Sequence, residues 1–172
     1  MNTNLTADLE RLALQEQQLM FEQFDPNIAW NLGCEMQARA SGLQAAVVID
    51  ISLHDRQMFH LAMPGTTPDN ADWIRRKRNT VLRCHQSSYA IGLKSQLDDI
   101  SFFEKTGASS KDYAVHGGSF PIIFKNLGCI GAITVSGLPQ RQDHNFVIET
   151  LAKFLEQPLE NLRLEPESTD ES

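Results

Sequence analysis

Apolar residues recur at helical spacing in four stretches of the chain. Leucines on one face of Asn4–Phe24 predict a first helix, and side chains four residues apart in Ile28–Ala40 predict a second helix after an Asp-Pro boundary. A third helix is expected over Ala71–Ala90. The fourth is expected to begin near Pro139, because proline is tolerated in a first turn and apolar residues follow at intervals of three and four.

Four further stretches are rich in β-branched or adjoining apolar residues and predict strands. Leu43–Ser52 and Met58–Ala62 are joined by a polar turn, so they predict one hairpin. His116–Phe124 and Cys129–Val135 predict a second hairpin. Pro121 lacks the N–H that an internal ladder needs, which predicts a late start, an edge position or a bulge for its strand.

The order helix, helix, hairpin, helix, hairpin, helix is typical of an α+β fold, in which helices pack over one antiparallel β-sheet. We therefore expect an N-terminal helix in residues 1–25, one domain over residues 26–158, and a tail over residues 159–172. The tail is acidic and almost without apolar residues, so disorder is expected from about Glu165.

Composition narrows the class of protein. The 172 residues suit one domain with short extensions, and 41% of them are hydrophobic, which is enough for an ordinary core. No stretch is long and apolar enough for a membrane helix or a signal core. The three cysteines are widely spaced, which argues against a zinc cage or a disulfide framework and favours a reducing cytoplasm. The net charge of −7 disfavours nucleic acid and anionic membrane surfaces as partners.

A tight corner separates the last predicted strand from the last helix. Ser136 and Gly137 end the strand, and Asp143 follows early in the helix, where a carboxylate favours the positive end of the helix dipole. Backbone N–H groups at such a corner can bind an anion. They can equally be capped by water or by side chains of the protein.

The third helix carries five cations in a chain of net negative charge. Arg76 and Arg83 can share one face of it, whereas Lys77 and Arg78 are expected to point to solvent. The shared face suits a carboxylate or phosphate ligand. The alternatives are a solvated face, pairing with the acidic N-terminal helix, or pairing with a buried carboxylate such as Asp50.

Two histidines are candidates for ligand binding or acid–base chemistry. His116 precedes Gly117 and Gly118, and paired glycines allow a close backbone approach or a positive φ. His144 follows Asp143, although neighbours on a helix point apart. Each histidine can serve as an iron ligand, as a base near neutral pH or as a structural hydrogen-bonding group. No metal-ligand spacing such as H-x-x-x-H occurs, so no metal centre is predicted.

Several of these segments resemble the haem-degrading-type family that includes the GlcG and HbpS proteins. That family has a VVD strand, a GG-x-PI segment, and a GAIGVSG corner followed by an acidic residue. The corresponding segments here are Val47–Asp50, Gly117–Ile122 and Gly131–Gly137, with Asp143 after the last of them.

The similarity is greater to an uncharacterised branch of that family. Its Trp-x-x-Arg-Lys…Thr-Val-x-Arg pattern matches Trp73–Arg83, its His-Gly-Gly-x-Phe-Pro-Ile pattern matches His116–Ile122, and its Val-Ser-Gly-Leu-Pro-Gln-x-x-Asp-His pattern matches Val135–His144. The resemblance implies a profilin-like or PAS-like sheet in a three-layer α/β/α arrangement, usually assembled as a homo-oligomer. It also implies haem as a candidate cofactor, because some relatives bind haem and are linked to its degradation.

Three kinds of function fit these observations. The first, which we favour, is a module that binds a small anionic ligand or haem. The second is an enzyme acting on haem or a small carboxylate, with His116 as acid or base. The third is a scaffold or interaction protein without a ligand. The ligand-binding candidates are Arg76, Arg83, His116, Gly117, Gly118, Ser136, Gly137, Asp143 and His144.

Overall fold

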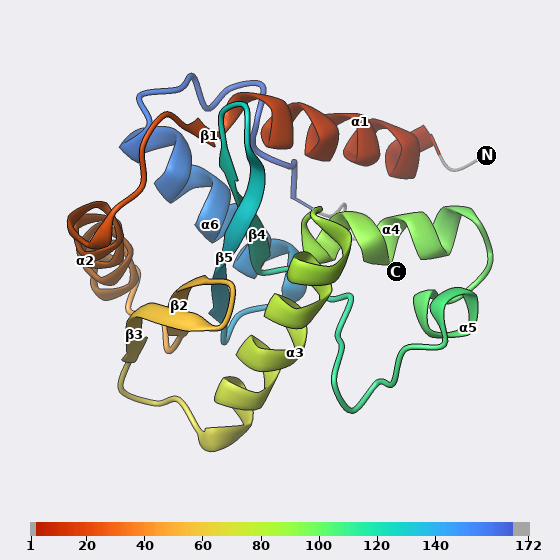
Figure 1. Ribbon diagram of the computed structural model, residues 1–172, viewed down its shortest axis with the longest axis horizontal. Coiled ribbons are helices and arrows are strands. Elements are labelled where there is room, and N and C mark those ends of the chain that lie inside the picture. The colour runs from red at the N-terminus through yellow and green to blue at the C-terminus, as the bar shows by residue number, and fades with distance from the viewer. Residues whose placement is uncertain (1–2, 167–172) are drawn as a thin grey trace.

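The computed structural model describes residues 3–166, which form six helices and one five-stranded sheet (Figure 1). The helices are α1 (Thr3–Gln18), α2 (Pro26–Gly42), α3 (Pro68–Cys84), α4 (Ser88–Leu97), α5 (Phe102–Thr106) and α6 (Gln140–Phe154). The strands are β1 (Met20–Phe21), β2 (Val48–Leu53), β3 (Arg56–Ala62), β4 (Ser119–Phe124) and β5 (Gly128–Ser136).

The sheet has the strand order β1-β4-β5-β2-β3. The pairs β4–β5, β5–β2 and β2–β3 are antiparallel, so the two predicted hairpins and the predicted α+β class are confirmed. The two-residue β1 was not expected and pairs in parallel with the end of β4, which makes the sheet mixed. The first helix ends at Gln18, so the prediction of a helix through Phe24 is wrong for its last residues.

Pro121 lies inside β4, opposite Ala132 of β5. β1 pairs only with Ile123 and Phe124, so the outer side of β4 needs no N–H from Pro121. The register of the β4–β5 pair also shifts between Ile122 and Ile123. An edge position and a register shift therefore both accompany this proline, as its place in the sequence predicts.

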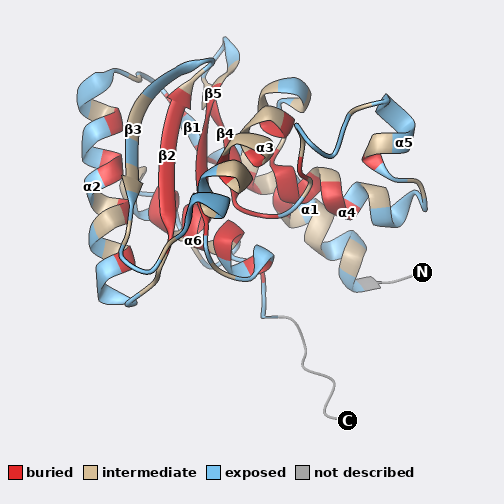
Figure 2. Ribbon diagram, turned by 90° about the horizontal axis from the view of Figure 1, so that it is seen from below, coloured by how far each residue is buried: buried red, intermediate tan, exposed pale blue. Residues whose placement is uncertain are grey.

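The two faces of the sheet differ in chemistry. One face is apolar and packs against α2 and α6, and its side chains include Ile49, Ile51 and Ile133. The opposite face is covered by α3 and carries buried polar side chains, including Asp50 and Thr134. Figure 2 shows β2 buried over most of its length, with α2 and α3 on opposite sides of it. This is the expected three-layer α/β/α arrangement.

The helix expected over Ala71–Ala90 is two helices, α3 and α4. α3 ends at Cys84, and His85 then takes a left-handed conformation with φ = 55°. Ser87 begins α4, because its Oγ accepts a backbone N–H of the first turn. No glycine or proline marks this break, so the pattern of apolar residues predicts one uninterrupted helix where the structure has two.

The two ends of the described chain pack on each other. Leu12 of α1 is buried in a small cluster with Leu93 of α4 and Leu164. Gln15 Nε2 donates to Leu162 O at 2.5 Å, and both Leu162 and Leu164 are fully buried. The expected tail therefore packs against the domain as far as Leu164, and its last part, residues 167–172, lies outside the described residues.

Candidate functional site

A buried lysine ties the polar side of the sheet to the last helix. Lys77 of α3 donates to Gly117 O at 2.9 Å, to Val135 O at 2.6 Å and to Asp143 Oδ2 at 3.1 Å. Burial lowers the pKa of Lys77, and the charge of Asp143 opposes that shift. The three acceptors use all three N–H donors of the ammonium group. Lys77 is therefore a structural cation rather than a free ligand for an external anion.

The two cations expected in solvent are in fact engaged inside the protein. Lys77 lies three residues after Ile74 and four before Val81, which places it in the buried stripe of α3. Arg78 Nη1 donates to Asp50 Oδ1 at 3.0 Å, and Asp50 is fully buried. The expectation is wrong for both residues, because the polar face of the sheet offers them acceptors.

The corner between β5 and α6 is filled by a carboxylate of the protein itself. Asp143 Oδ1 accepts the N–H of Leu138 at 2.9 Å, and Oδ2 accepts that of Gly137 at 3.4 Å. Asp143 is buried, which raises its pKa, while Lys77 beside it acts in the opposite direction. Side chains thus cap this corner, and its N–H groups are not left for an external anion.

His116 lies at the edge of this arrangement and is exposed to solvent. Its ring meets the ring of Trp73 edge-to-face, with 4.8 Å between the ring centres. Among residues 3–166, neither ring nitrogen of His116 has a hydrogen-bond partner. Partial burial, followed by the charges of Lys77 and Arg76, lowers the pKa of His116. The imidazole is therefore neutral at neutral pH.

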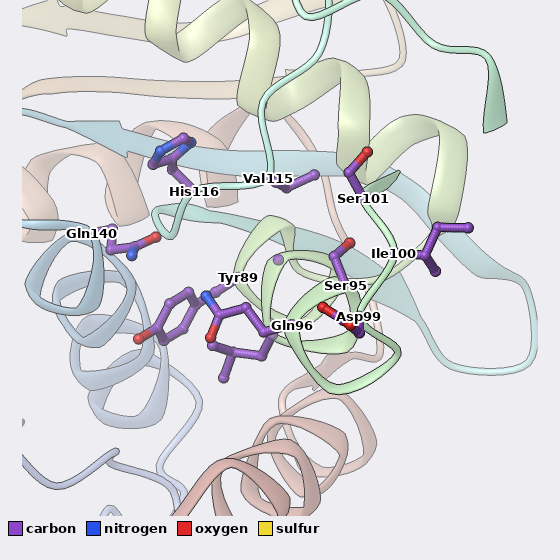
Figure 3. Close-up of a pocket in the computed structure, with 11 residues that line it drawn as sticks. Tyr89, Ser95, Gln96, Asp99, Ile100, Ser101, Val115, His116 and Gln140 are labelled. Atoms are coloured by element: carbon purple, nitrogen blue, oxygen red, sulfur yellow. The ribbon is translucent and has the colours of Figure 1, made fainter. Parts of the chain in front are cut away.

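Two adjoining pockets share His116 and Gln140. The first, which we call the cleft, has a volume of about 230 Å³ and is lined by Asp69, Asn70, Trp73, Lys77, His116, Gly117, Ser136, Gly137, Leu138, Gln140 and Asp143. The second, which we call the α4 pocket, has a volume of about 370 Å³. Figure 3 shows the α4 pocket, with His116 and Gln140 on one side and Ile100 and Ser101 on the other. A ligand touching His116 could extend into either pocket.

Most of the candidate residues meet at the cleft: His116, Gly117, Ser136, Gly137 and Asp143 line it. Gly118 lies behind it, since a Cβ there would lie 2.5 Å from Lys77 Nζ. Arg76 lies at its edge, because the guanidinium carbon is 4.1 Å from the centre of the Trp73 ring. Arg76 Nε donates to Asp72 at 2.7 Å.

Arg83 and His144 lie elsewhere. Arg83 Nη2 donates to Thr106 O at 3.3 Å, two helical turns beyond Arg76. His144 is fully buried, with Nε2 at 2.8 Å from Gln15 Oε1 and with no partner for Nδ1 among the described residues. Burial, and then the charge of Arg141, lowers the pKa of His144 to about 3. Neither side chain lines the cleft or the α4 pocket.

Sequence reasoning missed the contribution of Trp73, Asn70 and Gln140 to the cleft. Gln140 Oε1 accepts the N–H of Gly117 at 3.4 Å, so it links the start of α6 to the segment after His116. Its position as the first residue of the helix after the corner is the signal that could have indicated it. Trp73 and Asn70 lie in the first turns of α3, and that position could have indicated that they line the cleft.

Comparison with known families places the chain clearly. Residues 24–152 match the model of the family described as haem degrading protein HbpS-like. The chain belongs to the HbpS-like family. It is 51% identical over 162 residues to a UPF0303 protein of Rhizobium meliloti (strain 1021), which covers 94% of this chain and 99% of that protein. It is 49% identical over 162 residues to a UPF0303 protein of Azotobacter vinelandii, covering 94% of this chain and 98% of that protein.

Solved structures share the fold of this HbpS-like chain. The crystal structure of the Ybr137w protein superposes with a TM-score of 0.80 at 32% identity, covering 86% of this chain and 87% of the other. The PduOC:haem complex gives 0.65 at 18% identity, with 75% and 93% covered. HbpS gives 0.61 at 14% identity, with 79% and 92% covered. The last two identities are low, so these likenesses concern the fold alone.

The described part of this HbpS-like chain offers no ready-made metal site. Within residues 3–166, no group of three or more His, Cys, Asp or Glu side chains is placed to hold a metal ion. No helix in that range is both long and apolar enough to cross a membrane. Cys34, Cys84 and Cys129 are free thiols.

Proposed function

We propose that this chain is a small-molecule-binding protein whose ligand contacts His116 where the cleft meets the α4 pocket. The observation that carries the proposal is the state of His116. Its ring is exposed, neutral at neutral pH, and without a hydrogen-bond partner in the part of the chain that the structure describes. A titratable group of this kind beside a pocket is a candidate for ligand contact.

Haem is the ligand that we favour, and the residues present fit it. A neutral imidazole such as that of His116 is a common iron ligand. Trp73 and Leu138 offer apolar surface in the cleft. The terminal nitrogens of Arg76 have no partner among residues 3–166 and can pair with a carboxylate. Membership of a haem-degrading family, and likeness in fold to a PduOC:haem complex, support the same choice.

A small carboxylate or another small anion is the second candidate ligand. Since Asp143 already accepts the N–H groups of the corner, such a ligand would depend on Arg76 instead. A neutral His116 could also accept a proton from the bound molecule, which would make the protein an enzyme. The proposal includes a cytoplasmic location, because free cysteines suit a reducing compartment.

Titration of the purified protein with haemin, followed by the Soret absorbance, tests the proposal. The wild-type protein is expected to saturate with one site per chain. His116→Asn removes the imidazole but keeps a polar side chain, and it is expected to weaken haemin binding about tenfold or more. If haem binds, it would supply the iron, and His116 would hold that iron through its imidazole.

His54→Asn is the matched control. His54 is an exposed turn residue with φ = 49°, a conformation that asparagine tolerates. Its haemin affinity is expected to equal that of the wild type. Equal affinities for the two variants would rule out a role for His116, and the absence of any ligand in native mass spectrometry and titration would favour a scaffold protein.

A further inference from the structure

A third pocket adjoins the corner, and His116 is not among the residues that line it. It has a volume of about 580 Å³ and is formed by the end of α2, the first turns of α6, Arg163 and Pro166. Leu138 is the only residue that it shares with the cleft, and Pro139 follows on its own side. We call it the α2–α6 pocket.

The charges in the α2–α6 pocket do not balance. Arg39 and Arg163 both pair with Glu149: Arg39 Nη2 donates to Oε2, and Arg163 Nε lies 2.7 Å from Oε1. Burial and the charge of Arg163 lower the pKa of the Arg39 guanidinium. The third arginine, Arg141, is already held by Asp8. Two guanidinium groups therefore share one carboxylate, in a protein whose net charge is −7.

Beside the charged groups and the amides of Gln142 and Asn145, the wall of the pocket has an apolar part. Leu43 is 58% exposed and lines this part of the pocket. Phe146, Leu138 and Pro139 also line the pocket. The Arg39 guanidinium carbon lies 5.5 Å from the centre of the Phe146 ring, so the excess charge and the apolar wall adjoin each other.

We propose that the α2–α6 pocket binds an amphipathic anion, a molecule with a carboxylate joined to an apolar body. The carboxylate pairs with Arg163 and Arg39, which restores one negative charge for each positive one. The apolar body covers Leu43 and Phe146. This site is separate from the one at His116. Its ligand is held by a carboxylate, whereas the haem proposed at His116 is held by its iron.

Octanoate is a suitable probe, measured by isothermal titration calorimetry on the full chain. Octanoate is expected to bind with one site per chain. Octylammonium carries the same apolar body with the opposite charge, and acetate carries the same charge without the body. Both are expected to bind about tenfold or more weakly, because each lacks one of the two interactions.

Two single substitutions test the charge argument in opposite directions, and a third serves as a control. Arg163→Gln leaves Arg39 and Glu149 as a balanced pair, so the variant should fold while octanoate affinity falls about tenfold. Glu149→Gln removes the competing carboxylate, so octanoate affinity should rise. Arg56→Gln, at an exposed arginine on β3, is the matched control and should leave affinity unchanged.

Thermal melts of each variant show whether it is folded, and if Glu149→Gln does not fold, Arg163→Gln decides alone. Equal binding of octanoate and octylammonium would overturn the proposal. So would an equal loss of affinity in Arg163→Gln and Arg56→Gln, or no octanoate binding to the wild type. His116→Asn should leave octanoate binding unchanged, which separates this site from the proposed haem site.

Discussion

Lys77 joins three segments that are distant in sequence through a single ammonium group. Its acceptors are Gly117 O, Val135 O and Asp143 Oδ2. Gly118 belongs to the same arrangement, because a Cβ there would lie 2.4 Å from Val135 O and 2.5 Å from Lys77 Nζ. The absence of a side chain at Gly118 thus allows the lysine to approach the backbone, and the shape of the cleft depends on that approach.

We expect Lys77→Met to lower the free energy of unfolding by about 3–5 kcal/mol, because it leaves Asp143 as a buried charge without its partner. Urea unfolding followed by circular dichroism measures this. Combining Lys77→Met with Asp143→Asn should recover part of the loss, since no charge is then stranded. A loss below about 1 kcal/mol in the single variant would mean that water reaches Asp143 and that the pair is not truly buried.

His144 makes the stability of the protein depend on pH. Its pKa in the folded protein is lowered to about 3 by burial, from an ordinary value near 6.5 in the unfolded chain. The folded state therefore favours the neutral ring. The resulting stability is complete above pH ~6.5 and is lost as the pH falls from ~6.5 towards ~3.

From these pKa values, the loss due to His144 is about 2 kcal/mol between pH 7 and pH 5. His144→Gln keeps a side chain that can bond with Gln15 but removes the titration. Urea unfolding at the two pH values should show a smaller pH dependence in His144→Gln than in the wild type. Identical pH dependence in the two proteins would show that His144 is not protonated on unfolding in this range.

At the scale of the elements, α1 is held to the domain by a partly buried ion pair. Arg141 of α6 donates to both carboxylate oxygens of Asp8, at 2.7 and 2.9 Å. Leu12 adds an apolar contact next to it. The part of the apolar face of α1 around Leu12 is therefore covered within the subunit.

Asp8→Ala should loosen α1 without unfolding the sheet. The expected cost is about 2–3 kcal/mol, less than for a fully buried pair, because Asp8 keeps 15% of its side chain exposed. Hydrogen–deuterium exchange should show faster exchange in α1 and unchanged exchange in β5. Asp55→Ala, at an exposed turn, is the control and should change neither.

The elements also show where sequence reasoning succeeds and where it stops. The hairpins and α6 follow from strong local patterns, and the structure has them in the predicted order. The break at His85 has no glycine or proline to mark it, and β1 is too short to show any period. The charge of Lys77 favours solvent, but its spacing from Ile74 and Val81 in the sequence indicates the buried face of α3, where the structure has it.

At the scale of the whole molecule, the motifs indicate which segments line the cleft. They do not indicate which hydrogen-bonding groups and charges in the cleft are free to bind a ligand. The sequence left open whether an external anion or a side chain caps the N–H groups of the corner, and in the structure Asp143 accepts them. The arginine face divides, with Arg76 near the cleft and Arg83 beside Thr106. Both outcomes depend on the direction in which side chains point between the helices and the sheet, and a single sequence does not show that direction.

We also expect the protein to assemble as a homo-oligomer. Met20, Trp30 and Leu127 are large apolar residues that stay exposed in the single chain, and self-association would cover such surface. Light scattering at micromolar concentration should give at least about twice the mass of one chain. A monomer mass that persists up to high concentration would contradict this prediction.

The bond between Gln15 and Leu162 joins residues 147 positions apart and has a consequence for biosynthesis. α1 is translated long before Leu162 and Leu164, which form part of the surface that covers it. Until those residues have been translated, the leucines of α1 lack this part of their cover and are accessible to chaperones. The packing of α1 in the finished domain is thus completed only after Leu164 has been translated.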